Sequence, residues 1–346
     1  MPLKIIASIV LVANLILADR SVRAEEFALR FESSPPSERL RPQGEPATLA
    51  LTVTALDGQP VAEGWVALRL DAPPPNWLFS TDFPVVEGSR LLEMRLPLIN
   101  GKAEWRQVFP IRGDYRLAAE FAGSAGAKSD KVFSFHIHEK DQKWLGLGGF
   151  TLGLFITGVI AGRVFSAPRN GAGTKLGLWF FLILTWSAAA GESAWAQKDH
   201  KRNYISKIVV APATVGSPAR IHWWLHPAGV NGEPSVKLTL TIMHLEKNKL
   251  VFSLERIPVA GEFALDYHFT DGTDHRVIAV AEIEDGASVR QEKTVSVTAV
   301  APSLRTKLPP LFLFLAVIAV GLLAGRWSRR AGGSKLRSAE RRRSQA

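Results

Sequence analysis

Residues 132–162 read VFSFHIHEKDQKWLGLGGFTLGLFITGVIAG and contain both kinds of structure from which the chain is built. Over 132–138, aromatic and aliphatic side chains alternate with Ser and His, which is the period of a β-strand with one buried face. Residues 144–162 carry no charge and approach the ~20 residues that an α-helix needs to cross ~30 Å of hydrocarbon. The stretch therefore predicts a β-strand that leads, after a short polar link, into a transmembrane helix.

Similar apolar runs occur elsewhere, and they predict transmembrane helices over 144–165, 176–196 and 308–326. The N-terminal residues 1–24 have the form of a cleaved secretory signal peptide, with a short apolar run before the small residues Val22 and Ala24. The second span also resembles a signal peptide, because Lys175 precedes its apolar run and Ala194-Trp195-Ala196 follows it. Cleavage after Ala196 would yield two proteins, and retention of this segment yields one.

The formal charge of +10 is concentrated in two segments. Arg163, Arg169 and Lys175 give +3, and eight basic residues against Glu340 give +7 over 326–346. Because Lys and Arg stay on the cytoplasmic side of the spans that they flank, we expect a cytoplasmic loop over 166–175 and a basic cytoplasmic tail over 327–346. Both intervening domains are then periplasmic, at a bacterial inner membrane. Topology accounts for the charge, so no nucleic-acid partner is predicted.

Outside the spans, residues 25–140 and 200–302 read as two all-β domains. Short apolar runs alternate with turn signals, and no helical periodicity competes with them. About seven strands in about 110 residues is the size of an immunoglobulin-like sandwich. The predicted fold is two immunoglobulin-like β-sandwiches plus transmembrane α-helices. Since the chain has no cysteine, each sandwich is expected to be stabilised by its core without disulfides.

Two motifs in the first domain define its turns. Asn100-Gly101 predicts a two-residue β-hairpin, because a type I′ turn needs positive φ at both positions and these residues accept it. The segment Gly113-Asp114-Tyr115 resembles the tyrosine corner of immunoglobulin-like domains, in which the phenol hydrogen-bonds to the chain a few residues upstream.

The two halves of the sequence align at an offset of 160 residues, without a gap over the best stretch. There Gly101, Phe109, Asp114 and Arg116 coincide with Gly261, Phe269, Asp274 and Arg276. Residues 161–163 likewise coincide with 324–326, three residues further offset. The pattern indicates an internal duplication of a unit made of an export segment, a β domain and an anchor. His275 stands at the position of Tyr115, which argues against a tyrosine corner in the second half.

The candidate metal ligands are His136 and His138, which leave the same face of one predicted strand ~7 Å apart. Two such imidazoles suit copper or zinc, but a site needs further ligands. Candidates for the third ligand are Met94, Glu139, Asp141 and a free N-terminal amine. The alternative is that both histidines are simply polar residues on a solvent-facing strand.

The order of parts, a β domain, paired spans and a second β domain, together with the His-x-His motif at 136–138, resembles the copper-bearing periplasmic subunit of membrane methane and ammonia monooxygenases. The resemblance implies copper as a cofactor. The third span departs from that layout, and no complete ligand set can be carried across.

Glycines spaced four residues apart recur in the first and third spans, as Gly149 and Gly153, Gly158 and Gly162, and Gly321 and Gly325. Small residues at this spacing allow two helix backbones to approach closely in lipid. They predict that the first span packs on the third.

Motifs for catalysis are missing from the sequence. It contains no nucleophile elbow, His-Glu-x-x-His pair, phosphate-binding loop or dinucleotide fingerprint, and no catalytic residue can be nominated. We therefore expect a non-enzymatic interaction or accessory module of a membrane or periplasmic complex, with lipid and a protein as its partners and no cofactor. The alternative is a periplasmic accessory protein that handles copper through His136 and His138.

Overall fold

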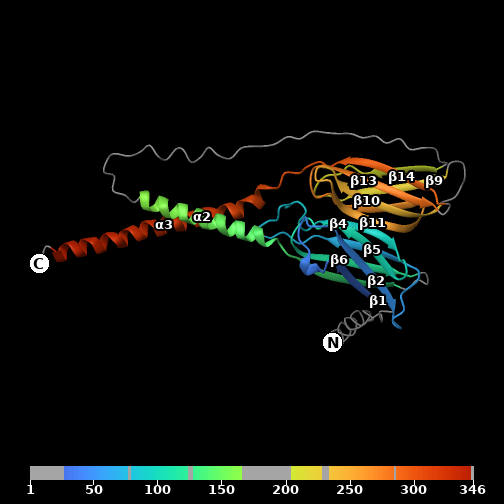
Figure 1. Ribbon diagram of the computed structural model, residues 1–346, viewed down its shortest axis with the longest axis horizontal. Coiled ribbons are helices and arrows are strands. Elements are labelled where there is room, and N and C mark those ends of the chain that lie inside the picture. The colour runs from blue at the N-terminus through green and yellow to red at the C-terminus, as the bar shows by residue number, and fades with distance from the viewer. Residues whose placement is uncertain are drawn as a thin grey trace, which may run out of the picture.

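The computed structural model describes residues 27–76, 79–123, 128–165, 204–227, 234–283 and 286–343. A two-layer β body stands at one end of a pair of long helices (Figure 1). The predicted signal peptide at 1–24, the loop at 166–175 and the second span at 176–196 lie outside the described residues.

The first half of the chain forms seven strands in two antiparallel layers, with β1-β2-β5 in one layer and β7-β6-β3-β4 in the other. Side chains alternate between core and solvent along these strands, as in β6, where Tyr115, Leu117 and Phe121 are buried. The strands are β1 (Phe27–Ser34), β2 (Ala47–Ala55), β3 (Trp65–Asp71), β4 (Arg90–Pro97), β5 (Lys102–Gln107), β6 (Gly113–Ala122) and β7 (Lys128–Ile137), with a short 3₁₀ helix, η1 (Ser37–Arg39), after β1.

The second half repeats this arrangement with β12-β9-β8 in one layer and β11-β10-β13-β14 in the other. If the strands of each half are numbered from one to seven, both halves have the order 1-2-5 in one layer and 7-6-3-4 in the other. The strands are β8 (Tyr204–Val210), β9 (Ala219–Pro227), β10 (Ser235–His244), β11 (Lys249–Ala260), β12 (Glu262–Tyr267), β13 (Asp274–Ile283) and β14 (Ser288–Ser296). Both halves are thus immunoglobulin-like sandwiches, as the sequence predicts.

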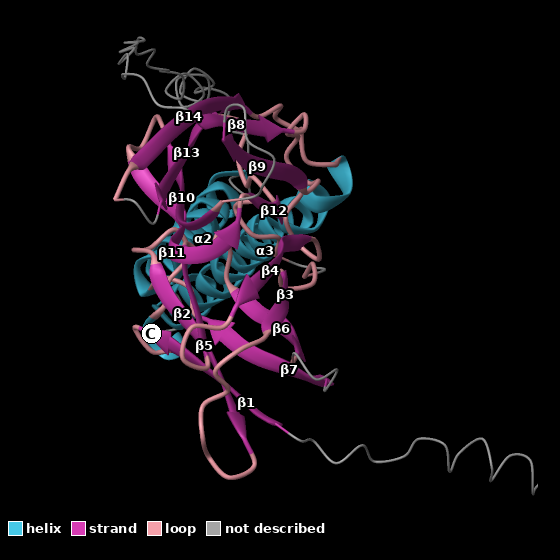
Figure 2. Cartoon of the chain, turned by 90° about the vertical axis from the view of Figure 1, so that its right-hand side faces the viewer, coloured by secondary structure: helices cyan, strands magenta, loops and turns pink. Residues whose placement is uncertain are grey.

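The two sandwiches join edge to edge, so that each layer continues from one half into the other as a seven-stranded sheet (Figure 2). In one layer β5 pairs with β11, and in the other β4 pairs with β12. The sequence does not predict this junction. An edge strand exposes unpaired backbone groups, and the hairpin β4–β5 and its counterpart β11–β12 satisfy each other's edges.

The two sides of the junction are related by an approximate two-fold axis, because each residue pair in one layer recurs in the other layer between residues shifted by 160 positions. The pair Phe252↔Gln107 corresponds to Leu92↔Tyr267, and Ser253↔Arg106 corresponds to Glu93↔Asp266. The flanking backbone bonds match as well, because the Val108 amide donates to Val251 and the His268 amide donates to Leu91, both at 2.9 Å. The halves therefore meet through equivalent surfaces.

A single hydrophobic core runs through both halves. Its largest fully buried side chains come from both, and include Trp105, Phe121, Trp223 and Phe252. The shared core follows from the continuous sheets, because their interior side chains pack against each other across the junction.

The Asn100-Gly101 pair forms a two-residue hairpin turn between β4 and β5, with φ of 52° and 75°. The amides and carbonyls of Ile99 and Lys102 close it at 2.9 and 3.0 Å. The Gly101 carbonyl accepts the Val53 amide at 2.8 Å, and in the second half Gly261 accepts the Leu225 amide at 2.7 Å. The turn thus ties the hairpin to a neighbouring strand in both halves.

Two helices, α2 (Asp141–Phe165) and α3 (Leu304–Arg343), follow the two sandwiches. Residues 141–165 and 304–329 are each long and apolar enough to cross a membrane. Most of their apolar side chains face outward, including Phe150, Ile160, Phe312 and Leu323. Such a surface is stable in lipid and unfavourable in water.

The helices pack through four glycines in a reciprocal arrangement. A Cβ on Gly158 would lie 2.6 Å from the Ile318 carbonyl, and one on Gly321 would lie 2.5 Å from the Phe155 carbonyl. Gly162 and Gly325 form the same pair of contacts with Leu322 and Val159, at 2.2 and 2.1 Å. Each contact repeats after 163 residues, so the two-fold relation extends to the helices. Gly149 and Gly153 lie outside this contact, with no atom within 4 Å of an added Cβ.

Candidate functional site

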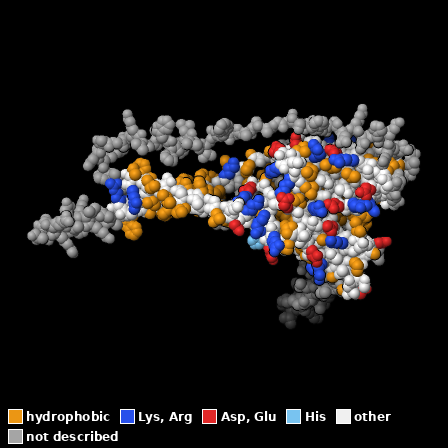
Figure 3. Space-filling model, in the orientation of Figure 1, with side chains coloured by type: hydrophobic (Ala, Val, Ile, Leu, Met, Phe, Trp, Pro, Cys, Tyr) orange, Lys and Arg blue, Asp and Glu red, His pale blue; other side chains and the backbone are white. Residues whose placement is uncertain are grey.

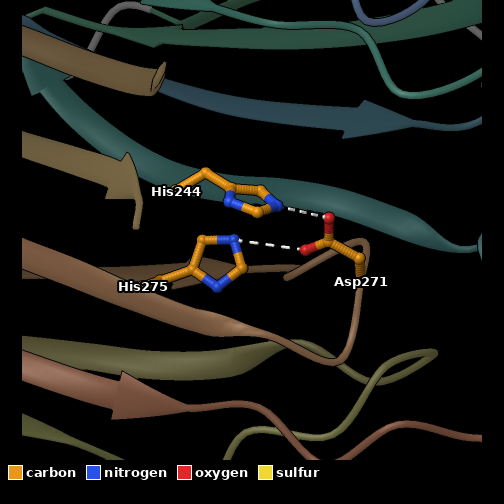
Figure 4. Close-up of side chains that lie close together, drawn as sticks. All are labelled: His244, Asp271 and His275. Atoms are coloured by element: carbon orange, nitrogen blue, oxygen red, sulfur yellow. Dashed lines mark hydrogen bonds and ion pairs between the residues drawn. The ribbon is translucent and has the colours of Figure 1, made fainter. Parts of the chain in front are cut away.

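Three side chains with metal-ligating atoms meet in the second sandwich, at its junction with the first. His244 ends β10, His275 lies opposite it on β13, and Asp271 lies in the turn before β13. One ligand atom from each lies within 4.8 Å of the other two. Figure 4 shows both imidazoles directed toward the carboxylate. Among the described residues, this is the group of three His, Asp or Glu side chains whose ligand atoms lie close enough together to hold a metal ion.

The Asp271 carboxylate bridges the two histidines. Its Oδ2 lies 2.8 Å from His244 Nε2, and its Oδ1 lies 3.4 Å from His275 Nε2. The Thr273 hydroxyl donates to Asp271 Oδ1 at 3.2 Å, and the Lys247 ammonium lies 3.6 Å from Oδ2. Both histidines are almost fully buried, whereas Asp271 is half-buried.

Backbone contacts assign the proton on each imidazole. The His275 Nδ1 lies 3.1 Å from the Thr273 carbonyl, an acceptor, so Nδ1 carries a proton. The His244 Nδ1 faces the Lys247 amide at 3.3 Å and accepts from it, so its proton is on Nε2 and is donated to Asp271. The two rings are therefore different tautomers, although both direct Nε2 at the same carboxylate.

Burial and charge act on these groups in opposite directions. Burial lowers the pKa of His275 below 6.5, more than the Thr273 carbonyl and the Asp271 charge raise it. The pKa of Asp271 would be raised by its burial, but the neighbouring His244, His275 and Lys247 outweigh this and hold it below its ordinary value. The state near neutral pH is an ionised carboxylate beside a neutral His275, whose Nε2 then has a lone pair and no proton.

The cluster borders a cavity of about 160 Å³ between the two halves. His244, Asp271 and Lys247 line it from the second half, while Phe83 and Val108 belong to the first. The Lys249 ammonium crosses the junction and donates to the Gln43 carbonyl at 3.1 Å. A small ligand in this cavity would contact both sandwiches.

The equivalent place in the first half is occupied by a tyrosine corner. The Tyr115 hydroxyl donates to the Ile111 carbonyl at 2.7 Å and accepts the Ile111 amide at 3.2 Å. Burial raises the pKa of this phenol far above its usual range, so it remains protonated. At the 160-residue offset Tyr115 and Ile111 become His275 and Asp271, and the aromatic neighbour Phe109 becomes Phe269.

The sequence-predicted pair His136 and His138 lies on and just after β7, near the start of α2. The rings are 4.6 Å apart between centroids, and His136 Nδ1 lies 2.7 Å from Asp114 Oδ1 on the neighbouring strand β6. Both histidines are exposed and line a broad cavity of about 550 Å³ with Glu139 and Trp144. In the described part of the chain, no group of three close ligand atoms includes them.

The cluster of His244, Asp271 and His275 was not predicted as a site from the sequence. The exchange of Tyr115 for His275 and of Ile111 for Asp271 marks two of its members, because paired exchanges four residues apart alter one corner of a fold that both halves share. His244 is 27 residues before Asp271, and only the pairing of β10 with β13 brings it to the others.

No family model and no curated protein matches this chain. Among solved structures, a conjugative transposon lipoprotein from Bacteroides eggerthii is 14% identical, with 28% of this chain and 98% of that chain covered and a TM-score of 0.22. CopC from Methylosinus trichosporium is 17% identical, with 29% and 99% covered and a TM-score of 0.22. Dimeric latent PorU from Porphyromonas gingivalis is 11% identical, with 80% and 34% covered and a TM-score of 0.26.

Proposed function

We propose that this chain is an exported, membrane-anchored protein whose two immunoglobulin-like sandwiches act together as a non-enzymatic accessory module of a membrane or periplasmic complex. The observation that carries the proposal is that two sandwiches and two apolar helices form one body. Equivalent contacts join the halves in both layers of the sandwich and in the helix pair. Such a body presents fixed surfaces at a set distance from the bilayer.

The charges support an orientation with the β body in the periplasm. Arg163 and Arg329 lie at the end of the helix pair away from the β body, where the Arg329 side chain donates to the Arg163 carbonyl at 2.7 Å. Figure 3 shows an apolar band along the helices, between the β body and a group of basic side chains at the far end of the helix pair. Under the positive-inside rule the basic end is cytoplasmic.

We infer that the two halves arose by internal duplication and fusion. The matching strand order, the symmetric ladder at the junction and the reciprocal glycine contacts all support this origin. A symmetric homodimer interface uses the same patch on both subunits, and the junction has this character within one chain.

The outer edges of the sheets are the surfaces that we assign to a protein partner. β1 and β14 end one layer, and β7 and β8 end the other. On β8 the apolar side chains of Ile205 and Val209 are 62% and 40% exposed. An extended segment that pairs with such an edge gains backbone hydrogen bonds and apolar contacts together.

Photo-crosslinking in intact cells tests the interaction role. A photoreactive residue in place of Ile205 or Val209 is expected to yield a discrete adduct with another protein, and the same residue in place of the exposed Glu104 on the inner strand β5 is not. Ile205→Lys combined with Val209→Lys should abolish co-purification of that protein. Absence of an adduct at both β8 positions would count against the proposal.

The orientation is tested by single cysteines, which the cysteine-free chain makes unambiguous. Ser134→Cys and Thr294→Cys, both on exposed strand positions, should react with a membrane-impermeant maleimide in intact spheroplasts. Ser338→Cys in the basic tail should react only after permeabilisation. The reverse pattern would place the β body in the cytoplasm and refute the assignment.

A further inference from the structure

We propose that His244, Asp271 and His275 form a binding site for a divalent transition-metal ion of the zinc type, at the junction of the two sandwiches. Each residue offers one ligand atom, and the three atoms lie within 4.8 Å of one another. Two imidazole nitrogens and one carboxylate oxygen are donors that zinc accepts. Calcium and magnesium prefer oxygen donors and large or octahedral shells, so the donor set selects against them.

His275 is already prepared as a ligand. Its Nδ1 proton is held by the Thr273 carbonyl, as in many metal-bound histidines whose second nitrogen donates to a backbone carbonyl. Its Nε2 lies 3.4 Å from Asp271 Oδ1, so the second nitrogen of the ring is directed at the carboxylate that would share the metal. A cation between these two atoms would bind to both of them.

His244 needs one change of tautomer. Its Nε2 proton, now donated to Asp271 Oδ2 at 2.8 Å, must be replaced by a proton on Nδ1 before Nε2 can bind a metal. The change gives up the 2.8 Å hydrogen bond to Asp271, which the metal would replace, and the 3.3 Å approach of the Lys247 amide to Nδ1, which is long for a hydrogen bond. The change moves a proton within the ring and leaves its charge unaltered.

Lys247 places a cation beside Asp271 in the metal-free state. Its ammonium lies 3.6 Å from Asp271 Oδ2, while half of its side chain is exposed. Because an exposed ion pair of this kind is weak, the side chain can leave for solvent when a metal enters. Removal of the lysine should therefore strengthen metal binding.

The adjacent cavity provides the remaining coordination position. At about 160 Å³ it has room for a water molecule on a metal bound to His244 and Asp271, which both line it. Three protein ligands plus a solvent position is a common arrangement for zinc. The metal would be reached from the junction and not through the core of the second sandwich.

The site stands where the first half has its tyrosine corner. There the Tyr115 hydroxyl fixes the chain by bonding to Ile111, four residues upstream. In the second half a metal shared by His275 and Asp271 would fix the same corner and also attach it to β10 through His244. The duplicated corner is thus expected to be locked by metal in one half and by a hydrogen bond in the other.

The test is a zinc titration of the full-length chain, stripped of metal and kept in mild detergent, followed by elemental analysis and thermal unfolding. We expect about one zinc ion per chain and a higher unfolding temperature with zinc, and neither effect with calcium. His275→Tyr, which copies the corner of the first half, and the near-isosteric Asp271→Asn should each lose the bound zinc. Lys247→Ala should bind it about two- to fivefold more tightly.

The double variant His136→Ala with His138→Ala is the matched control, since it removes the exposed histidine pair and should retain one zinc. Wild-type protein that binds no zinc would overturn the proposal without reliance on any variant. Zinc retained in both His275→Tyr and Asp271→Asn, or lost in the His136 and His138 control, would also overturn it. Circular dichroism of each variant establishes that it is folded.

Discussion

The two halves of this chain share one scaffold, and one of its corners is closed in different ways in the two halves. In the first half a buried tyrosine closes the corner through its hydroxyl, and in the second a buried histidine at the same position faces a carboxylate. The phenol is neutral and needs only a backbone partner, whereas the imidazole and carboxylate bring titratable and metal-ligating atoms to the junction. The same scaffold can therefore carry different chemistry at equivalent corners of its two halves.

The largest effect is expected where the halves are most alike, in the helix pair. Gly162→Leu and Gly325→Leu should both separate the helices, because a Cβ at either position meets a backbone carbonyl at 2.2 or 2.1 Å and no side chain can move aside. Overpacking of this kind costs ~1–3 kcal/mol in ordinary cores and more where the backbone must shift. The measurement is loss of the disulfide between cysteines introduced at Val159 and Leu322.

Gly149→Leu is the control for the helix pair, since nothing lies within 4 Å of its added Cβ. Unequal effects of Gly162→Leu and Gly325→Leu would show that the two contacts are not equivalent and would break the two-fold relation at the helices.

A smaller effect is expected at the tyrosine corner. Tyr115→Phe removes the donor to the Ile111 carbonyl and the acceptor of its amide, and leaves both backbone groups buried. The expected loss is ~1–3 kcal/mol in the unfolding free energy of the full chain, read from denaturant curves in detergent. Ser134→Ala, at an exposed position of β7, should change it little. An unaltered midpoint for Tyr115→Phe would mean that the corner contributes nothing.

The smallest effect is expected in the dependence of stability on pH. It involves His268, which corresponds to Val108 in the first half. Its Nε2 accepts the Gly216 amide at 2.9 Å, and its Nδ1 lies 3.2 Å from the Arg90 carbonyl across the junction. Burial lowers the pKa of His268 below 6.5, more than the Arg90 carbonyl raises it. Stability is then complete above about pH 6.5 and falls as the pH drops toward the depressed folded-state pKa, because the unfolded state binds the proton first.

Each unit by which this pKa is depressed is worth ~1.4 kcal/mol of stability. His268→Gln should therefore flatten the dependence of unfolding free energy on pH below 6.5, measured as the difference from wild type at each pH. Parallel curves for the two proteins would contradict the assignment to His268.

The architecture within each half follows from local signals. Alternation in 132–138 and the Asn100-Gly101 turn depend on residues close in sequence, and the structure has a strand and a hairpin there. Small residues at Gly158, Gly162, Gly321 and Gly325 likewise indicate a helix contact from spacing alone. Gly149 and Gly153 have the same spacing but point elsewhere, because spacing does not fix which face of a helix meets its neighbour.

The junction and the candidate site depend on contacts across long stretches of chain. Nothing local in Glu93 or Asp266 indicates that β4 and β12 pair, since edge strands read like any other strand. The His-x-His pattern at 136–138 can be read from its spacing in the sequence, whereas His244 joins Asp271 and His275 only through the register of β10 on β13. A ligand set assembled by register has no short motif.

The central claim is that two equivalent halves are joined by their hairpin edges, and a disulfide across the junction tests it most directly. Opposed residues in neighbouring antiparallel strands have Cβ atoms ~4.5–5.5 Å apart, close to the separation in a disulfide. The chain with Glu93→Cys, Asp266→Cys and a protease site inserted after Gln197 is oxidised and cut. We predict that the two pieces stay linked until reductant is added, whereas the control pair Ala67→Cys and Arg95→Cys oxidises within the first piece alone. If the control oxidises and the pieces of the junction variant separate with free thiols, the halves are not joined as described.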